Sequence, residues 1–424
     1  MKVMVAHPAQ QHSYRLAEAL KKAGMLSKYA TTVYYKKPSL TWLAACFLRG
    51  KFRIKAGARH SAELSDAEVI QFCEGEGLLK LLALNTRFFN KYYRKIKYHT
   101  ADRFAKKAAK YAIRHKVDAV VTYDDTSPIL FEVLKRDAPN ILRILDVSAA
   151  STLYMRSIYE KDIQLAPRFG DRLRRERKIV WNPEMIERTK REFVSTQKFL
   201  VPSKFVARSL EYSDVQKQQM YLCPYGVDIS QFSQKKYDKS YTSGPLKFIY
   251  VGGIKELKGI FYLFEAFKQI PKTQAVLTVV GQADITGEDV RPYLEYVNFT
   301  GSVIHSDVPK LLHQADIFVF PSLGEGMSLS VLEAAACGLP LIVSENSGVD
   351  DITDGKEGFV IPIQSVEAIK EKAVWFVHHP QAIEIMGNRA RQLALKYTWN
   401  SYDSRAADIF KSFEIGDSGH QWGK

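Results

Sequence analysis

The sequence predicts two α/β domains, each a doubly wound parallel sheet covered by helices. Three observations support this prediction. The 424 residues exceed what one ordinary hydrophobic core accommodates, and 46% of them are hydrophobic. Short β-branched runs alternate with segments of helical period, which is the pattern of successive βα units. A polar, Lys/Ser-rich stretch without periodicity, residues 231–244, separates the two series.

The first half contains five expected strands separated by helical segments. The strands are Lys2–His7, Tyr29–Tyr35, Ala119–Asp124, Leu142–Val147 and Lys198–Pro202. Between the first two, Arg15–Met25 places its apolar residues on one stripe, as an amphipathic helix does. Ala101–His115 has similar spacing and is strongly basic.

The second half repeats this pattern more clearly. Its expected strands are Leu246–Val251, Ala275–Val280, Val297–Thr300, Ile317–Pro321, Pro340–Ser344 and Gly358–Ile361. A helix with one apolar face is expected over Gly259–Ile270. The chain ends with an amphipathic segment, Ser401–Phe413, that no strand follows.

These elements predict where the domains divide. We expect a first domain over residues 1–205, a second over 206–399, and a helix within 400–424 that packs back on the first domain. Two such domains would form a cleft lined by the carboxyl ends of both sheets. Open α/β sheets bind their ligands at that edge.

The excess positive charge is confined to the first half. Residues 1–205 contain 40 Lys and Arg against 20 Asp and Glu, whereas the remainder contains 21 against 26. Such a surface is either merely solvated or meets an anionic partner, which would be nucleic acid or an anionic membrane. Composition alone leaves these alternatives open.

The cysteines and the apolar runs predict the compartment. Cys46, Cys73, Cys223 and Cys337 lie far apart and lack the spacing of a zinc site, so we expect neither disulfides nor a bound metal. The apolar run at the N-terminus is too short for a signal peptide, and no uncharged stretch approaches the ~18 residues that span a bilayer. We therefore expect a cytoplasmic protein.

The strongest local signal runs from Phe320 to Pro340. A buried strand ends in a Gly-containing loop that presents Glu325, and a small-residue helix that begins near Ser328 carries Glu333. The first backbone amides of that helix would point into the cleft, where helix N-termini bind phosphate. The two carboxylates bracket this anion site and accept hydrogen bonds from hydroxyls. A ligand with a central diphosphate and a sugar at each end satisfies both demands.

A second anion-binding element follows the first strand of the second domain. Gly252 and Gly253 allow close backbone approach, and Lys258 stands just before the helix that begins at Gly259. The Lys258 ammonium would reach the same phosphates. The pattern is weak alone and much stronger beside the Glu325 and Glu333 segment.

Taken together, these residues resemble the retaining GT-B glycosyltransferases of family 4. The similarity covers the second half, through Lys258-Gly259, Val280-Gly281, Phe299-Thr300-Gly301-Ser302-Val303, Ala315 to Ser322, the two glutamates, and Gly348 to Gly358. Val201-Pro202-Ser203 with Pro224-Tyr225-Gly226-Val227-Asp228 resembles the interdomain segment of that family. The resemblance implies a GT-B fold, in which two Rossmann-like domains face a central cleft, and transfer of a sugar from a nucleoside-diphosphate sugar.

The resemblance also implies roles for individual residues. Glu333 would hold the ribose, and the backbone near Gly301 and Val303 would meet the nucleobase. The transferred sugar would be held by Glu325 with the backbone of Gly326, Met327 and Ser328, and the diphosphate by Lys258 with the amides of Leu329 and Ser330. Catalysis is expected to be mainly electrostatic, with neither metal nor other cofactor.

The sequence departs from the family pattern at Gly253, where relatives usually carry an Arg. One of the two cations expected at the diphosphate is therefore missing. We expect Lys255 to replace it by reaching inward.

The acceptor side is less clearly marked. The loop after the first strand carries polar groups where many relatives have glycines, and Asp124 and Asp146 end later strands on the same side. The candidate acceptor-side residues are His7, Gln10, Gln11, His12, Asp124 and Asp146, of which His12 is also a catalytic candidate. A purely structural role for the histidines is the alternative. Many relatives have a His after the strand that ends here at Asp146, and its absence leaves the acceptor-side base open.

Two basic segments of the first half suggest a partner surface. Within residues 36–60 an apolar run, Leu40 to Leu48, precedes a basic cluster, which is typical of an interfacial membrane segment. A helix buried against its own domain is the alternative. Residues 85–116 interleave basic and aromatic side chains, a pattern that also suits nucleic acid.

We therefore predict a retaining glycosyltransferase that uses a nucleoside-diphosphate sugar and a glycan or lipid-linked acceptor, in envelope or polysaccharide assembly. It would be cytoplasmic and peripheral on the cytoplasmic face of an anionic membrane. The alternatives are a GT-B epimerase acting on the nucleotide sugar and a nucleic-acid-binding protein. The carboxylates around the phosphate cradle argue against nucleic acid. The motifs do not fix the nucleobase, the sugar, the acceptor, the linkage or the oligomeric state.

Overall fold

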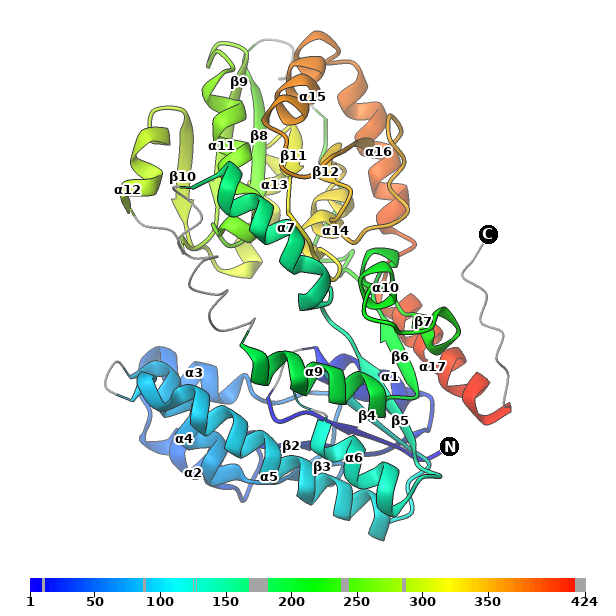
Figure 1. Cartoon of the computed structure of the whole chain (residues 1–424). Coiled ribbons are helices and arrows are strands. Elements are labelled where there is room, and N and C mark those ends of the chain that lie inside the picture. Colours follow the sequence, from blue (N-terminus) through cyan, green and yellow to red (C-terminus); the bar gives the residue numbers. More distant parts are fainter. Residues whose placement is uncertain are drawn as a thin grey trace.

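The computed structural model describes residues 1–9, 12–86, 89–124, 126, 128–167, 182–237, 244–283 and 287–415. Two parallel sheets account for the strands among them, and helices cover both faces of each sheet (Figure 1). The predicted fold class, two doubly wound domains, is confirmed.

The first sheet has seven parallel strands in the order β3-β2-β1-β4-β5-β6-β7. Their bounds are β1 Val3–Ala6, β2 Leu26–Thr31, β3 Val69–Gln71, β4 Ala119–Tyr123, β5 Leu142–Asp146, β6 Lys198–Val201 and β7 Met220–Leu222. The helices are α1 Ser13–Lys22, α2 Leu40–Phe47, α3 Gly50–Gly57, α4 Glu74–Asn85, α5 Tyr93–Arg114, α6 Pro128–Asp137, α7 Thr152–Leu165, α9 Pro183–Ser195 and α10 Lys204–Glu211. The central strands β1 and β4 are buried along their whole length, as near-continuous apolar runs in a parallel sheet should be.

The second sheet has six parallel strands in the order β10-β9-β8-β11-β12-β13. Their bounds are β8 Leu246–Val251, β9 Ala275–Val280, β10 Val297–Gly301, β11 Ile317–Phe320, β12 Leu341–Ser344 and β13 Gly358–Ile361. The helices are α11 Ile260–Lys268, α12 Gly287–Val290, α13 Val308–His313, α14 Leu329–Ala336, α15 Val366–His378, α16 Ala382–Ala394 and α17 Trp399–Ile415. Each predicted strand of this half is present, with bounds that differ by at most one residue.

The first sheet corrects three details of the prediction. Strand β2 covers Leu26–Thr31, not Tyr29–Tyr35, because the ladder with β1 ends at Ala30 while Val33 and Tyr34 are buried without joining it. Strands β3 and β7 were not predicted, since three residues are too few to show an alternating pattern. Because β7 pairs with β6, the first sheet continues to Leu222, beyond the predicted end of the first domain at residue 205.

Two helices connect the domains. Helix α17, at the end of the chain, packs against α1 of the first domain, where Lys22 and Asp403 form an ion pair at 2.6 Å. Helix α7 lies beside the second domain (Figure 1), and its Asp162 accepts hydrogen bonds from Tyr262 at 2.6 Å and Gln364 at 3.3 Å. Helix α17 follows the second domain and packs on the first, whereas α7 belongs to the first domain and bonds to the second. Both helices therefore hold the two domains together.

Among the described residues, no helix is both long enough and apolar enough to cross a bilayer. The four cysteines are free, with Cys46 exposed and the other three buried.

Candidate active site

The predicted site residues of the second domain lie where loops from both domains meet. Gly326, in the loop after β11, approaches the segment after β5 so closely that a Cβ atom there would lie 1.8 Å from the carbonyl oxygen of Ser148. Ser203, after β6, donates its hydroxyl to the carbonyl of Gly326 at 2.6 Å. The segment that resembles a sugar-binding loop is therefore held directly against the first domain.

The loop after β8 depends on two glycines outside the loop itself. Gly259 has φ +68°, and a Cβ atom there would lie 2.0 Å from the carbonyl oxygen of Pro321. Gly281 has φ +151°, and its Cβ would lie 1.8 Å from the carbonyl oxygen of Gly252. Any side chain at these positions would push the β8 loop away from the ends of β9 and β11.

Lys258 and Glu325 form an ion pair at 2.5 Å between Nζ and Oε1. Lys258 ends the short 3-10 turn Glu256–Lys258 just before α11, and Glu325 follows β11. Ser322 donates its hydroxyl to the same carboxylate oxygen at 2.5 Å. The two predicted catalytic residues of the second domain are thus brought together, and both side chains are mostly buried, at 25% and 13% exposed.

Helix α14 begins directly after this ion pair. Ser328 is its N-cap and accepts a hydrogen bond from the amide of Val331, while Met327 before it is buried. The first amides of a helix, here those of Leu329 and Ser330, have no acceptor within the helix and carry the positive end of its dipole. The predicted phosphate cradle is therefore formed by a capped helix start beside Lys258.

Glu333, farther along α14, pairs with His305 at 2.9 Å. Burial raises the pKa of the Glu333 carboxyl, and the hydrogen bond from His305 acts against that rise. His305 is 63% exposed and follows Gly301 and Val303 in the loop after β10. Sequence reasoning did not identify His305. It did single out Gly301 and Val303, which precede His305 in the loop at the carboxyl end of β10.

Lys255 lies against Gly253. A Cβ atom built on Gly253 would lie 3.0 Å from Cε of Lys255, so the lysine side chain occupies the space where a side chain at position 253 would start. The substitution of Lys255 for a cation at position 253 stays a prediction.

On the first-domain side, His12 is the centre of a hydrogen-bond network. Its Nε2 lies 3.2 Å from Oδ2 of Asp146 and 3.2 Å from the hydroxyl of Tyr225. Burial alone would lower the pKa of His12, but the negative charge of Asp146, its hydrogen bond and the charge of Asp124 raise it above its ordinary value. The surroundings of His12 therefore favour its protonated form. Tyr225 of the interdomain segment is a partner that the sequence reasoning did not assign.

The other predicted acceptor-side residues have local bonds. His7 is 2% exposed, burial lowers its pKa to about 3, and its Nδ1 accepts the amide of Ala9 at 3.0 Å. Asp124 accepts the hydroxyl of Ser148 at 2.9 Å. Gln10 and Gln11 lie outside the described residues. Of the acceptor-side candidates, the structure brings together His12 and Asp146 and buries His7.

With this geometry in place, the second domain can be compared with known families. Residues 245–379 match the family described as glycosyl transferases group 1. Over these residues the second domain is similar to group 1 glycosyltransferases. The match contains Lys255, Lys258, Glu325 and Glu333, so the sites described above lie inside the family region. The predicted resemblance to GT-B glycosyltransferases is confirmed, whereas its narrower assignment to family 4 stays a prediction.

Two curated relatives are similar to part of this chain. Glycogen synthase of Mycobacterium tuberculosis is 28% identical over 184 residues, which are 41% of this chain and 44% of that protein. The UDP-Gal:alpha-D-GlcNAc-diphosphoundecaprenol alpha-1,3-galactosyltransferase of Escherichia coli is 28% identical over 193 residues, 42% of this chain and 50% of that protein. The chain thus spans half or less of these relatives.

A solved structure extends the likeness to both domains. Sucrose-phosphate synthase of Thermosynechococcus elongatus superposes with a TM-score of 0.66 over 98% of this chain and 100% of that chain, at 17% sequence identity. At this identity the likeness concerns the fold alone. The GT-B arrangement of the two sheets agrees with it.

Proposed function

We propose that this protein is a glycosyltransferase that moves a sugar from a nucleoside-diphosphate sugar to a hydroxyl of a lipid-linked or envelope glycan. The observation that carries the proposal is the Lys258–Glu325 pair beside the capped start of α14, inside the region similar to group 1 glycosyltransferases and against the first domain. The name of the Escherichia coli relative contains both a UDP-sugar and a diphosphoundecaprenol-linked acceptor, which supports this choice of substrates.

On the donor side, the proposed mechanism is electrostatic. Lys258, Lys255 and the first amides of α14 would stabilise the negative charge that develops on the leaving nucleoside diphosphate. Glu325 would exchange its bond with Lys258 for hydroxyls of the transferred sugar, and Glu333 would accept the ribose hydroxyls in place of His305. Fixed donors and lysines supply the positive charge, so the mechanism requires no metal.

On the acceptor side, His12 would orient the attacking hydroxyl. Because Asp146 and Asp124 raise its pKa, His12 stays protonated to higher pH than an ordinary histidine, held by Asp146 and facing Tyr225. A protonated His12 donates a hydrogen bond to the donor sugar or to the acceptor and removes no proton. The base that accepts the hydroxyl proton in a retaining transfer is then the leaving phosphate oxygen itself, and attack occurs on the face that the phosphate leaves.

The first domain would bring the enzyme to its acceptor. Phe47 on α2 is 80% exposed and Ile54 on α3 is 74% exposed, both within the basic segment of residues 36–60. Exposed large apolar residues among cations are typical of a surface that rests on an anionic membrane. We propose that α2 and α3 make that contact.

The decisive experiment is a thermal-shift screen against nucleotides and nucleoside-diphosphate sugars. At equal concentration, a preferred donor should raise the unfolding temperature more than its competitors do, because it binds the folded state more tightly. The reaction of the preferred donor is then followed by NMR, with and without an acceptor extract.

A transferred sugar whose anomeric bond has the same configuration as in the donor supports a retaining transferase. A changed sugar released on the nucleotide without acceptor would favour the epimerase instead, and no donor binding would refute the proposal.

A further inference from the structure

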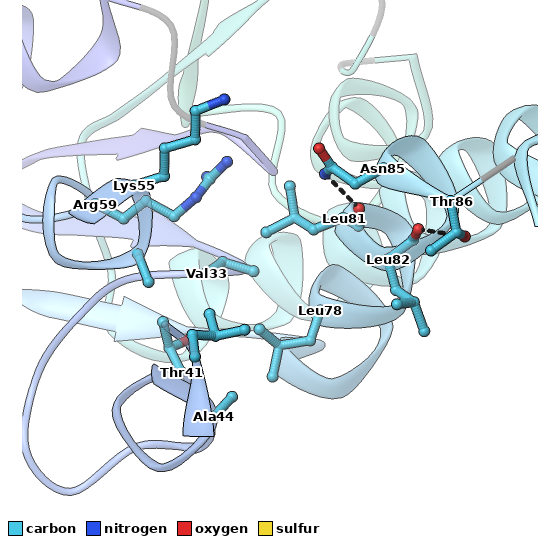
Figure 2. Close-up of a pocket in the computed structure, with 12 residues that line it drawn as sticks. Val33, Thr41, Ala44, Lys55, Arg59, Leu78, Leu81, Leu82, Asn85 and Thr86 are labelled. Atoms are coloured by element: carbon cyan, nitrogen blue, oxygen red, sulfur yellow. Dashed lines mark hydrogen bonds between the residues drawn. The ribbon is translucent and has the colours of Figure 1, made fainter. Parts of the chain in front are cut away.

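A cavity of about 440 Å³ lies in the first domain, away from the residues of the candidate active site. Its walls come from α2, α3 and α4, with Val33 after β2 (Figure 2). Its volume falls within the range of roughly 300–1,000 Å³ typical of pockets for small molecules. The lining residues used below are Ala44, Leu48, Lys55, Arg59, Leu78, Leu81 and Leu82.

The lining of this pocket is mainly apolar. Helix α4 contributes Leu78, Leu81 and Leu82, which share one face of the helix because of their spacing. Helix α2 contributes Ala44, and Leu48 follows directly after α2. Leu82 is nevertheless 49% exposed. Half-exposed leucines around a cavity of this volume leave apolar surface that an apolar ligand would bury.

Two cations complete the lining. Figure 2 shows the charged ends of Lys55 and Arg59 pointing in the same direction, on the side of the pocket where Asn85 lies. Within the described part of the chain, neither Lys55 nor Arg59 forms an ion pair with an acidic side chain. Two cations beside an apolar cavity suit a ligand whose hydrocarbon chain carries an anionic group at one end.

Two hydrogen bonds connect residues near the pocket with the acceptor-side loop of the cleft. Thr32, next to the lining residue Val33, donates its hydroxyl to the carbonyl of Pro8 at 2.9 Å, and Lys80 of α4 donates to the same oxygen at 2.9 Å. Pro8 belongs to the loop that leads to His12. An amphiphile held in the pocket would thus be held beside the segment that presents the proposed acceptor-side histidine.

We propose that this pocket binds the hydrocarbon chain of the lipid-linked acceptor, with the phosphate next to the chain paired to Lys55 and Arg59. The inference rests on the proposed function, since it assigns the lipid end of the acceptor whose hydroxyl receives the sugar. The occupant is a single chain with a phosphate head, and bulk membrane phospholipid is a different source that the test must exclude.

The test measures binding of alkyl phosphates to the full chain by titration calorimetry, below the concentration at which they form micelles. Dodecyl phosphate should bind, hexyl phosphate more weakly, and inorganic phosphate and dodecanol at least tenfold more weakly than dodecyl phosphate. Equal binding of inorganic phosphate and dodecyl phosphate would overturn the proposal, because the apolar walls would then contribute nothing.

The matched variants are Leu82→Gln and Leu84→Gln. Both leucines are on α4 and both are 49% exposed, but only Leu82 lines the pocket. We expect Leu82→Gln to weaken dodecyl phosphate at least tenfold and Leu84→Gln to change it less than twofold. Similar weakening by both variants would overturn the proposal. For the head group, Lys55→Gln should weaken dodecyl phosphate and Lys110→Gln, an exposed lysine on α5, should not.

Phosphatidylglycerol vesicles distinguish the two lipid sources. Leu82→Gln should leave vesicle binding unchanged while it weakens dodecyl phosphate, and equal weakening of both would assign the pocket to membrane phospholipid and overturn the proposal. Failure here is separable from failure of the proposed function, because donor binding by the second domain is measured independently. If the protein binds its donor but no alkyl phosphate, the pocket proposal is refuted and the proposed function is not.

Discussion

The donor site of the second domain and the pocket of the first domain satisfy their charges in different ways. In the second domain, the charged residues of the predicted donor site pair with one another, Lys258 with Glu325 and His305 with Glu333, on a framework of buried strands. In the first domain, Lys55 and Arg59 face a cavity and large apolar residues of α2 and α3 are exposed. The difference agrees with our proposals, in which the second domain exchanges internal pairs for a small ligand and the first domain meets a partner that supplies the missing groups.

The largest expected effect comes from breaking the Lys258–Glu325 pair. Lys258→Met should lower kcat by roughly 10²–10³-fold, since a fixed cation at the leaving group is lost. Glu325→Gln should lower kcat similarly through the transferred sugar. Steady-state kinetics with the preferred donor measure both, and Lys268→Met, an exposed lysine of α11, is the control. Near-normal kcat in Lys258→Met would remove the electrostatic role from the donor side.

The next effect concerns the unusual Gly253 and Lys255. Lys255→Ala should lower kcat by about 10²-fold if its ammonium acts at the diphosphate. The double variant Gly253→Arg with Lys255→Ala should recover most of the loss, because removing Lys255 frees the space where a side chain at 253 begins. Kinetics of the two variants decide the matter. Full activity in Lys255→Ala, or no recovery in the double variant, would contradict the substitution.

A smaller effect is expected at Glu333. Glu333→Ala should raise the KM for the donor by roughly 10–100-fold, the worth of hydrogen bonds to a charged group, with a smaller change in kcat. Glu367→Ala, an exposed glutamate of α15, controls for the loss of one negative charge. Unchanged donor affinity by calorimetry would refute the assignment of Glu333 to the ribose.

The donor side shows how far the sequence alone predicts such a site. Gly259, Gly281 and Gly326 each stand where a Cβ atom would meet backbone at 2.0 Å or less, so their spacing in the sequence reports the packing of the loops directly. Where two backbone segments approach so closely, only glycine fits, and its positions can be recognised in the sequence. The strands of the second domain were placed by their apolar runs, and the roles of the donor residues came from the family resemblance that these glycines help to carry.

Other features left no such pattern. The partners of His12 and Glu333, Tyr225 and His305, come from distant segments and are chosen by tertiary packing, so no local spacing announces them. Strand β7 is three residues long and is recognisable only by its pairing with β6. For the pocket between α2, α3 and α4, the sequence showed only an apolar run beside basic residues. That pattern does not predict a cavity.

The outward surface of the first domain gives the fourth prediction. Ile54→Ser should weaken binding to vesicles that contain anionic lipid by about tenfold, in line with the ~1.5–3 kcal/mol of burying such a side chain. Val194→Ser is the control, since Val194 on α9 is equally exposed, at 74%. Flotation across a salt series measures both. Equal binding of the two variants would contradict a membrane contact through α3.

The smallest expected effect concerns protonation of His12. Because its pKa in the folded protein is raised above the ordinary 6.5, its pair with Asp146 stabilises the fold fully below about pH 6.5. That stabilisation is lost as the pH rises through the raised pKa. The free energy of unfolding of the wild type should exceed that of His12→Gln by about 1 kcal/mol near pH 6 and by less near pH 9.

Denaturant titrations of both proteins at the two pH values measure this difference, and His378→Gln, an exposed histidine of α15, is the control. A pH-dependent difference would mean that His12 and Asp146 on the cleft face of the first domain, like the charged residues of the donor side, form an internal pair. A difference that is the same at both pH values would contradict a His12 pKa that is raised within this range. A neutral His12 would accept the Tyr225 hydroxyl and become a candidate for the acceptor-side base.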